Sequence, residues 1–231
     1  MANDLTQQLR QLAQRQGVTM YVLMQAGFQL LLHGITGQWD ILVGVTVNNR
    51  VRPELDRLIG CLVDAALLRS TLAGDLTFTQ YPNQVRATVL DALAHQGYPS
   101  TLLAERLGIQ ENANRPPLVQ APLNYLHAEI LGERAPSSAG DNALPLERCD
   151  ISVPLVGNWE EDFILGILEE QDQLRGLIRY NTDLFEATTI AHMAEAFQTL
   201  LRAVVDHPEQ PISVLLQVVS NPLAEFQRTA L

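Results

Sequence analysis

The sequence contains no lysine, since all fifteen of its basic residues are arginine. A chain without lysine cannot form a lysine Schiff base or use a lysine amine as a nucleophile. Acidic residues outnumber the basic ones, 26 to 15, and the formal net charge at pH 7 is −11. A protein with this net negative charge has little electrostatic attraction to nucleic acid or to anionic lipid. We therefore expect neither nucleic acid nor a membrane among the partners.

Cysteine is nearly absent, and the motifs of several site classes are missing. Neither Cys61 nor Cys149 belongs to a Cys-x-x-Cys or His/Cys cluster, so the sequence offers neither a disulfide framework nor a metal-ligand spacing. Both lie in apolar runs, where we predict buried, unreactive thiols. A Gly-rich phosphate loop and a Gly-x-Ser-x-Gly elbow are also missing from the sequence, which removes the common signatures of nucleotide sites and hydrolases. No metal is expected.

No long hydrophobic run is present. The longest apolar stretch, residues 20–32, is interrupted by Gln25 and Gln29 and is too short to span a bilayer. The polar, amphipathic start of the chain does not resemble a signal peptide. The cytoplasm is therefore the expected location.

The apolar pattern predicts one α/β domain. A chain of 231 residues with 47% hydrophobic and 18% charged residues can bury a substantial core. Helical spacing predicts helices over residues 4–16, 20–33, 81–95, 100–107 and from about 186 to 204. Apolar and β-branched runs predict strands over residues 41–47, 61–69, 118–127, 151–158, 163–169 and 174–180. This order favours an α/β sandwich, a mixed sheet with helices packed on it, over residues 1–207, followed by a surface tail at 208–231.

Several polar side chains have a structural and a functional interpretation. Arg50 and Arg52, just before Pro53, either pair locally in a solvated loop or bind an anion such as phosphopantetheine, and the spacing favours the loop. His95 is expected to cap the C-terminus of a helix, with general base as the alternative. Asp64 lies in an apolar run and needs a partner, most simply an arginine; Asp150 is a similar case, and Arg115 is expected to anchor a loop.

Seven segments occur in an order that is similar to one known family. They are TGQWD at 36–40, the loop and strand from Asn49 through Gly60 to residue 69, HQGYP at 95–99, NRPPLVQ at 114–120, CDI at 149–151, RYNTDLF at 179–185 and PEQPI at 208–212. Together they resemble the C-terminal half of the condensation domains of nonribosomal peptide synthetases. The resemblance covers nearly the whole chain.

The resemblance implies a chloramphenicol-acetyltransferase-like lobe, one of two that form a V around a tunnel. Carrier-bound thioesters would enter from opposite ends, and the acceptor amine would attack the donor thioester to form an amide. The family's His-His-x-x-x-Asp-Gly motif lies on the N-terminal lobe, and the five histidines of this chain are all isolated. The chain is therefore expected to be inactive alone and to hold no cofactor directly. Its substrates would be carried on phosphopantetheine.

The implied partners are peptidyl carrier proteins, an N-terminal lobe and a neighbouring adenylation domain. The residues that the resemblance assigns to the tunnel wall and the lobe interface are Asn49, Arg50, Gly60, Asp64, His95, Tyr98, Arg115, Gln120 and Asn124. The chain departs from the family motifs at Asp64 and Ala65, in place of Asn and Thr, and at Ser100, in place of Phe. Two alternatives remain: a non-catalytic half-domain that pairs with an N-terminal lobe or docks carrier proteins, and a stand-alone acyltransferase that uses His95 or His127.

Overall fold

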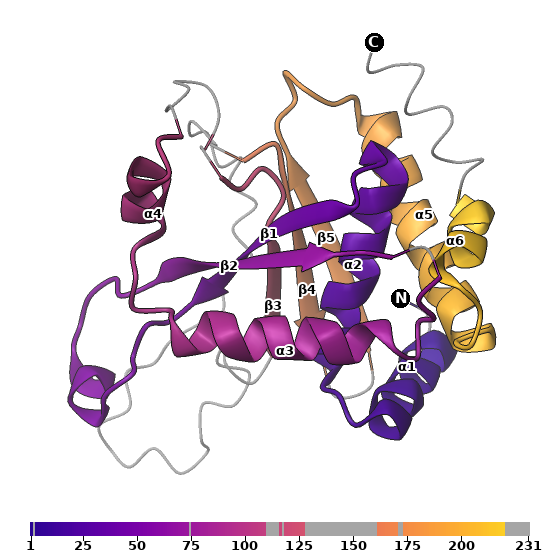
Figure 1. Ribbon diagram of the computed structural model, residues 1–231, viewed down its shortest axis with the longest axis horizontal. Helices are drawn as coiled ribbons and strands as arrows, with labels where there is room; N and C mark the ends of the chain where they lie inside the picture. The colour runs from indigo at the N-terminus through magenta and orange to yellow at the C-terminus, as the bar shows by residue number, and fades with distance from the viewer. Residues whose placement is uncertain are drawn as a thin grey trace, which may run out of the picture.

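The chain folds into helices and strands that alternate along the sequence (Figure 1). The computed structural model describes residues 1, 3–73, 75–109, 116, 118–127, 161–170 and 173–219. The strands are β1 (Asp40–Val47), β2 (Asp64–Thr71), β3 (Leu123–His127), β4 (Phe163–Glu169) and β5 (Leu174–Tyr180). The α-helices are α1 (Asn3–Gln16), α2 (Met20–Thr36), α3 (Tyr81–Ala94), α4 (Ser100–Arg106), α5 (Ala187–Asp206) and α6 (Ile212–Leu215). Two short 3-10 helices accompany them, η1 (Pro53–Arg57) and η3 (Leu216–Val219).

Local signals set the ends of the central helix, α2. The Thr19 hydroxyl accepts a hydrogen bond from the Val22 N–H at 3.2 Å, which satisfies one of the free donors of the first turn. Gly37 ends the helix in the left-handed conformation, with φ of 69°, and its N–H donates to the carbonyl of His33. Nearly every residue between these caps is buried, so α2 occupies the middle of the core, as its apolar sequence predicts.

The strands form two sheets rather than the single mixed sheet that the sequence suggested. β1 and β2 pair antiparallel, and β3, β4 and β5 form a three-stranded sheet in which β3 is parallel and β5 antiparallel to β4. The predicted α/β fold, with a mixed sheet and helices packed on it, is therefore confirmed. The division of the strands into two sheets was not predicted. β1 and β3 meet through side chains, where the Thr46 hydroxyl donates to Asn124 Oδ1 at 2.6 Å.

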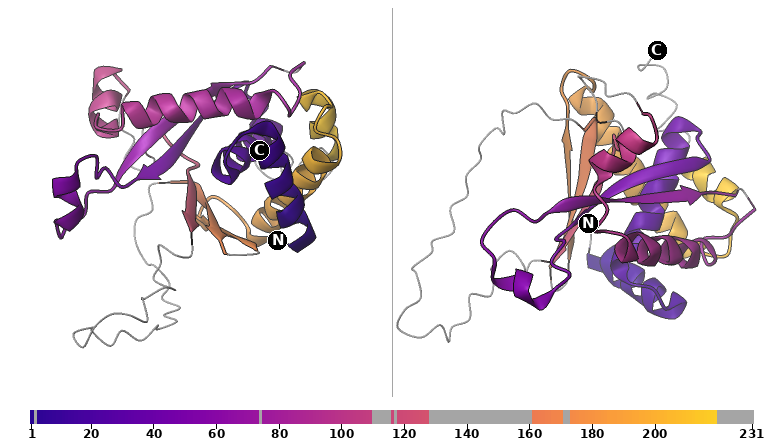
Figure 2. Two further views of the ribbon diagram at one scale, coloured as in Figure 1. Left: turned by 90° about the horizontal axis from the view of Figure 1, so that it is seen from below. Right: turned by 60° about the vertical axis from the view of Figure 1, so that its left-hand side comes forward.

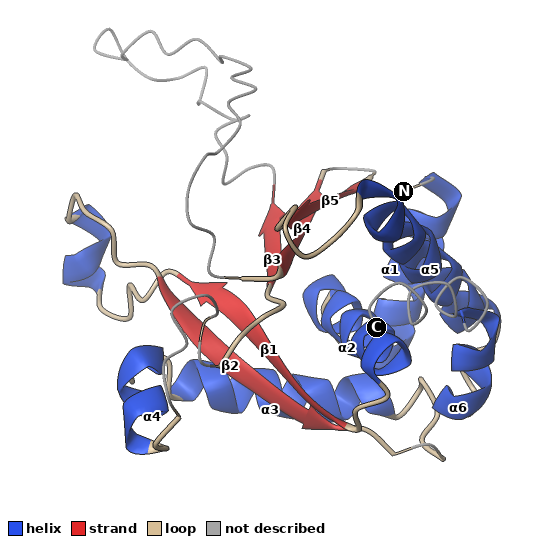
Figure 3. Ribbon diagram, turned by 90° about the horizontal axis from the view of Figure 1, so that it is seen from above, coloured by secondary structure: helices blue, strands red, loops and turns tan. Residues whose placement is uncertain are grey.

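Helices cover one face of the three-stranded sheet. α1, α2 and α5 lie together on that side (Figures 2 and 3), where Phe28 of α2 meets Phe163 of β4 in an edge-to-face contact with ring centroids 6.1 Å apart. The opposite face carries exposed apolar side chains, including Leu126 and Leu177. α3 runs along the β1–β2 pair, and α4 stands beside the end of β2 (Figure 3). One side of each sheet is thus left open.

The predicted strand at 61–69 is wrong in its boundaries and its burial. β2 begins at Asp64, because Asp64 pairs with Val47, the last residue of β1. Only one face of β2 is buried. Cys61 is exposed in the loop before β2, so the prediction of a buried thiol there is also wrong. Cys149 and the predicted strand at 151–158 lie outside the described residues.

The predicted surface tail is wrong for its first part. Ile212 and Leu215 are buried in the core, and the Ile212 N–H donates to the carbonyl of Leu76 at 2.8 Å. Residues 220–231 lie outside the described part. The strand predicted at 118–127 shortens to β3, because Pro122 has no N–H for a sheet ladder.

In the described ranges, no single helix is long and apolar enough to cross a membrane. Only α1 and α2 taken together reach that length and composition, and they are bent by 104° at the break between them.

Candidate functional site

The loop between β1 and β2 is closed by an arginine. The Asn48 side chain accepts a hydrogen bond from the Arg50 N–H at 3.2 Å, and Asn49 adopts a left-handed conformation with φ of 51°. This turn directs the Arg50 guanidinium back across the loop, where it donates to the carbonyls of Leu55 and, at 3.5 Å, Gly60. Arg50 therefore acts locally, as the spacing favoured, although its partners are carbonyls rather than the acidic residues of the loop.

The same loop presents apolar side chains to solvent. Val51, Leu58 and Val63 are each more than half exposed, and Ile59 is fully exposed. Isolated exposed apolar residues are ordinary, but four within thirteen residues of one loop point to a partner surface. We call Val51, Leu58, Ile59 and Val63 the apolar loop.

Two adjoining hollows lie beside β2, and one of them lies where the open faces of the two sheets meet. The first, which we call the inter-sheet pocket, has a volume of about 220 Å³ and lies between β1, β2, β3 and β4. Thr46 and Asn124 line it, and they are joined by the hydrogen bond already described. The predicted residue Asn124 thus lines this pocket.

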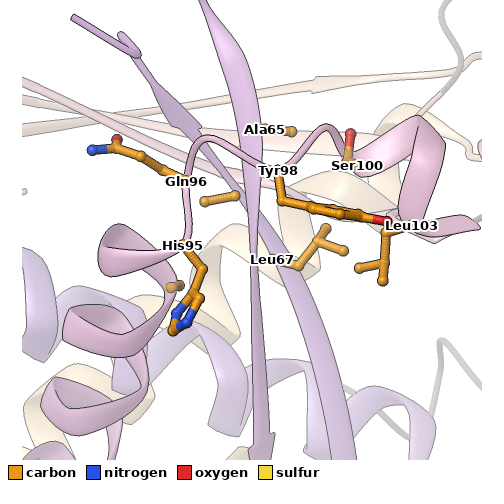
Figure 4. Close-up of a pocket in the computed structure, with 9 residues that line it drawn as sticks. Ala65, Leu67, His95, Gln96, Tyr98, Ser100 and Leu103 are labelled. Carbon is orange, nitrogen blue, oxygen red and sulfur yellow. The ribbon is translucent and has the colours of Figure 1, made fainter. Parts of the chain in front are cut away.

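The second hollow, which we call the apolar pocket, has a volume of about 360 Å³. It lies between β2, the C-terminal end of α3 and α4, and its wall includes Ala65, Leu67, Tyr98 and Leu103 (Figure 4). Ala65, Leu67 and Ser100 line both pockets. The two hollows therefore adjoin at these three residues, and we call them together the groove.

The two predicted residues His95 and Tyr98 both line the apolar pocket. His95 ends α3, and its Nδ1 lies 2.8 Å from the carbonyl of Asp91. Because a carbonyl oxygen only accepts, Nδ1 carries the proton and the ring caps the helix, as the sequence predicts. Tyr98 is 47% exposed, and its ring lies beside Leu67 and Leu103 at the pocket (Figure 4).

Other predicted residues lie near the groove without lining these pockets. Asp64 is half-buried, and its Oδ1 accepts a hydrogen bond from the Ala65 N–H at 2.7 Å, a backbone partner in place of the expected arginine. Gln120 donates to the carbonyl of Pro116 at 3.1 Å, and its own carbonyl accepts from the Asp162 N–H at 2.9 Å. This residue fixes the entry to β3. Arg115 and Asp150 lie outside the described residues.

A charged cluster at the other end of β3 was not anticipated. The Tyr125 hydroxyl donates to Glu169 Oε2 at 2.5 Å, and His127 Nδ1 lies 3.3 Å from the same oxygen. Arg10 of α1 donates to Glu169 Oε1 at 3.3 Å and to the carbonyl of Glu170 at 3.0 Å. Burial, together with the adjacent Glu169 carboxylate, raises the pKa of Tyr125 well above its ordinary value. Arg10 thereby joins α1 to the sheet.

Only tertiary pairing brings these groups together. His127 stands opposite Glu169 in the parallel ladder between β3 and β4, and no local sequence signal links the two. In the part of the chain that the structure describes, no group of three or more His, Cys, Asp and Glu side chains could hold a metal ion.

Comparison with known proteins identifies the family. A family model, described as the condensation domain, matches residues 1–221. The chain belongs to the condensation-domain family. Curated relatives include bacitracin synthase 2 of Bacillus licheniformis, with 32% identity over 91% of this chain and 8% of that protein. Another is phosphinothricin tripeptide synthetase PhsC of Streptomyces viridochromogenes, with 32% identity over 97% of this chain and 21% of that protein.

Solved structures agree on the fold of this condensation-domain chain. A four-domain nonribosomal peptide synthetase bound to AMP and glycine superposes with a TM-score of 0.78 at 24% identity, over 92% of this chain and 17% of that one. The X-domain from teicoplanin biosynthesis gives 0.77 at 25% identity, over 91% of this chain and 47% of that one. This chain therefore spans less than half of these solved chains and a small part of the curated relatives.

Proposed function

We propose that this chain is the C-terminal lobe of a condensation domain with a chloramphenicol-acetyltransferase-like fold, and that its groove is one wall of the substrate tunnel. The observation that carries the proposal is that the open faces of both sheets meet at the inter-sheet pocket, which Asn124 lines and which shares Ala65 and Ser100 with the apolar pocket. The match to this family over residues 1–221 supports it. So does the coverage of less than half of the solved chains.

The proposed reaction is amide formation between two carrier-bound thioesters. The amine of the acceptor aminoacyl group attacks the carbonyl carbon of the donor acyl or peptidyl thioester. The new C–N bond forms, the C–S bond breaks, and the donor phosphopantetheine leaves as a thiol while the amine loses a proton. Peptidyl carrier proteins would deliver both groups, and a neighbouring adenylation domain would load the acceptor.

The chain's own part in this reaction is to bind and orient. At the groove, His95 Nδ1 donates its proton to the backbone carbonyl of Asp91 and so caps α3. Thr46 and Asn124 offer uncharged hydrogen-bonding groups suited to amides. The His-His-x-x-x-Asp-Gly motif does not occur in the sequence, so proton transfer would rest with an N-terminal lobe. This chain alone is proposed to be inactive.

The apolar loop supports a second candidate function, a half-domain that pairs with an N-terminal lobe without catalysing condensation. Its four exposed apolar side chains lie in the loop closed by Arg50. Burying them against a partner would stabilise a complex by roughly 1.5–3 kcal/mol for the fully exposed Ile59 and by about half of that for each of the other three, which are already partly covered. Both candidate functions require this surface. They differ in whether the paired lobes catalyse the reaction.

The test combines this chain with the N-terminal lobe of a condensation domain from bacitracin synthase 2. Pairing is measured by calorimetry, and amide formation from two loaded carrier proteins is measured by mass spectrometry. We expect the pair, but not the chain alone, to form product. Product from the chain alone would refute the need for a second lobe, binding without product would select the half-domain, and absence of binding would refute both.

A matched pair of variants locates the surface. Leu58 and Leu90 are exposed to nearly the same extent, 52% and 56%, but Leu58 lies in the apolar loop and Leu90 on α3. We expect Leu58→Asp to weaken pairing at least tenfold and Leu90→Asp to leave it unchanged. Equal effects of the two changes would show that the apolar loop is not the contact surface.

A further inference from the structure

The apolar pocket is larger than ordinary packing defects and is lined chiefly by carbon. Its volume of about 360 Å³ falls in the range of small-ligand sites. At about 30 Å³ for a water-sized group, it has room for on the order of ten heavy atoms. The polar side chains at its edge do not fill it: the His95 ring is turned to the last turn of α3, and Gln96 points away from Tyr98 (Figure 4).

Small side chains keep this space open. Ala65 on β2, Ala92 on α3 and Ser100 at the start of α4 all face it, where longer side chains would occupy the hollow. Ala65 and Ser100 are also two of the positions at which this sequence departs from the motifs that it resembles. Leu67, Leu103 and the ring of Tyr98 supply the larger apolar surfaces of the wall (Figure 4).

The pocket adjoins a more polar hollow. Ala65, Leu67 and Ser100 are shared with the inter-sheet pocket, where Thr46 and Asn124 present a hydroxyl and an amide. A ligand that lies across both pockets would have hydrogen-bonding groups beside one part and carbon beside the other. A pantetheine thioester has this order of chemistry, with two amides followed by the thioester and its acyl group.

We infer that the apolar pocket binds the aliphatic part of a carrier-borne thioester, while the pantetheine amides lie in the inter-sheet pocket. This inference rests on the proposed function and adds a substrate preference to it: groups with an aliphatic chain bind better than acetyl or glycyl groups. Ser100 and Ala65 are then specificity-determining residues, because their size sets the depth of the pocket.

Two probes, acetyl-pantetheine and hexanoyl-pantetheine, test the inference with the chain itself. Each methylene transferred from water into an apolar pocket strengthens binding about fourfold. The pocket is open on one side, so we expect hexanoyl-pantetheine to bind at least tenfold more tightly than acetyl-pantetheine, measured by calorimetry or ligand-observed NMR. Equal affinities of the two probes would overturn the inference.

Filling the pocket should remove the preference. Ser100→Phe and Ala65→Leu place bulk from two different elements into the same space, so failure of one variant to fold leaves the other as a test. Because both residues also line the inter-sheet pocket, acetyl-pantetheine can lose affinity as well. We expect the affinity for hexanoyl-pantetheine to fall at least tenfold more than the affinity for acetyl-pantetheine in either variant. Leu107→Phe is the control, because Leu107 is exposed just beyond α4 and does not line the pocket.

The outcomes separate this inference from the proposed function. If both filled variants still prefer hexanoyl-pantetheine, the hexanoyl group binds elsewhere on the protein, and the pocket assignment is overturned. Condensation by the paired lobes without any chain-length preference would leave the proposed function standing and overturn the inference alone. A hexanoyl preference that both filled variants abolish supports the pocket, whatever the condensation assay shows.

Discussion

Gly44 allows β1 to lie close to the segment that leads into β3, and Gly44→Ala tests that role. A Cβ at Gly44 would lie 2.6 Å from Cγ1 of Val119 and 3.2 Å from its Cγ2. Both distances are shorter than a normal carbon contact, and the branched valine has little rotamer freedom with which to move aside. The substituted chain must therefore shift Val119 or separate β1 from the segment that leads into β3.

The expected cost is the difference between two terms. Overpacking of this kind costs about 1–3 kcal/mol, and replacing glycine by alanine in a strand returns about 0.5–1 kcal/mol of backbone entropy. We expect a net loss of about 1–2 kcal/mol in the free energy of unfolding. For a chain of this size that corresponds to a fall of roughly 2–8 °C in Tm, measured by calorimetry or circular dichroism.

Two further variants complete the test. Gly176→Ala in β5 is the control, because a Cβ there meets nothing within 4 Å, and it should leave Tm unchanged or slightly raised. Val119→Ala removes the clashing methyl groups, so the double variant Gly44→Ala with Val119→Ala should recover most of the loss caused by Gly44→Ala. Additive effects of the two changes would refute the steric explanation.

Three other regions give predictions with separate measurements. Glu169→Gln removes a carboxylate that accepts hydrogen bonds from Arg10 and Tyr125, so it should lower the free energy of unfolding in urea by about 1–3 kcal/mol; an unchanged midpoint would mean that the cluster does not hold α1 to the sheet. Burial raises the pKa of Tyr21 to about 12 and that of Tyr125 higher still, and a raised pKa in the folded state stabilises the fold below pH 10. The contribution of Tyr21 should be lost as the pH rises from 10 to 12, and that of Tyr125 should begin to fall above pH 10. Tyr125→Phe should therefore flatten the loss in alkaline unfolding curves, and an identical slope would contradict the assignment. Cys61 is exposed, so a thiol reagent should modify it in the folded protein at close to the rate of an unfolded peptide, and strong protection would show that the loop is covered.

Local sequence signals anticipated most of the secondary structure. The start of the buried helix α2 after Thr19 was predicted, as were α3 from Tyr81 and the pair β4–β5, whereas α2 runs beyond its predicted end at His33 to Thr36. These features depend on hydrogen bonds and side-chain periodicity within about twenty residues. The beginning of β2 could not be read in this way, because apolar residues stand on both sides of Asp64 and only the end of β1 decides where pairing starts.

The candidate site was anticipated in part. His95, Tyr98 and Asn124, all chosen through the family resemblance, line the groove. Ala65 and Ser100 were noticed only as departures from the family motifs, and their place at the junction of the two pockets was not visible. Thr46 gave no signal of its own, since an alternating position in a strand is compatible with solvent or with a partner.

The sequence by itself determined the class of the fold, the helix ends and the family to which the chain belongs, because these follow from periodicity, capping residues and motif order. The tertiary structure decided that the strands divide into two sheets, that Thr46 meets Asn124 across 78 positions and that the small residues Ala65 and Ser100 open one pocket. The reason is physical: such contacts depend on how closely segments far apart in the sequence pack against each other. Gly44 and Val119 are one such pair, and their fit is a property of the folded chain and not of either segment alone.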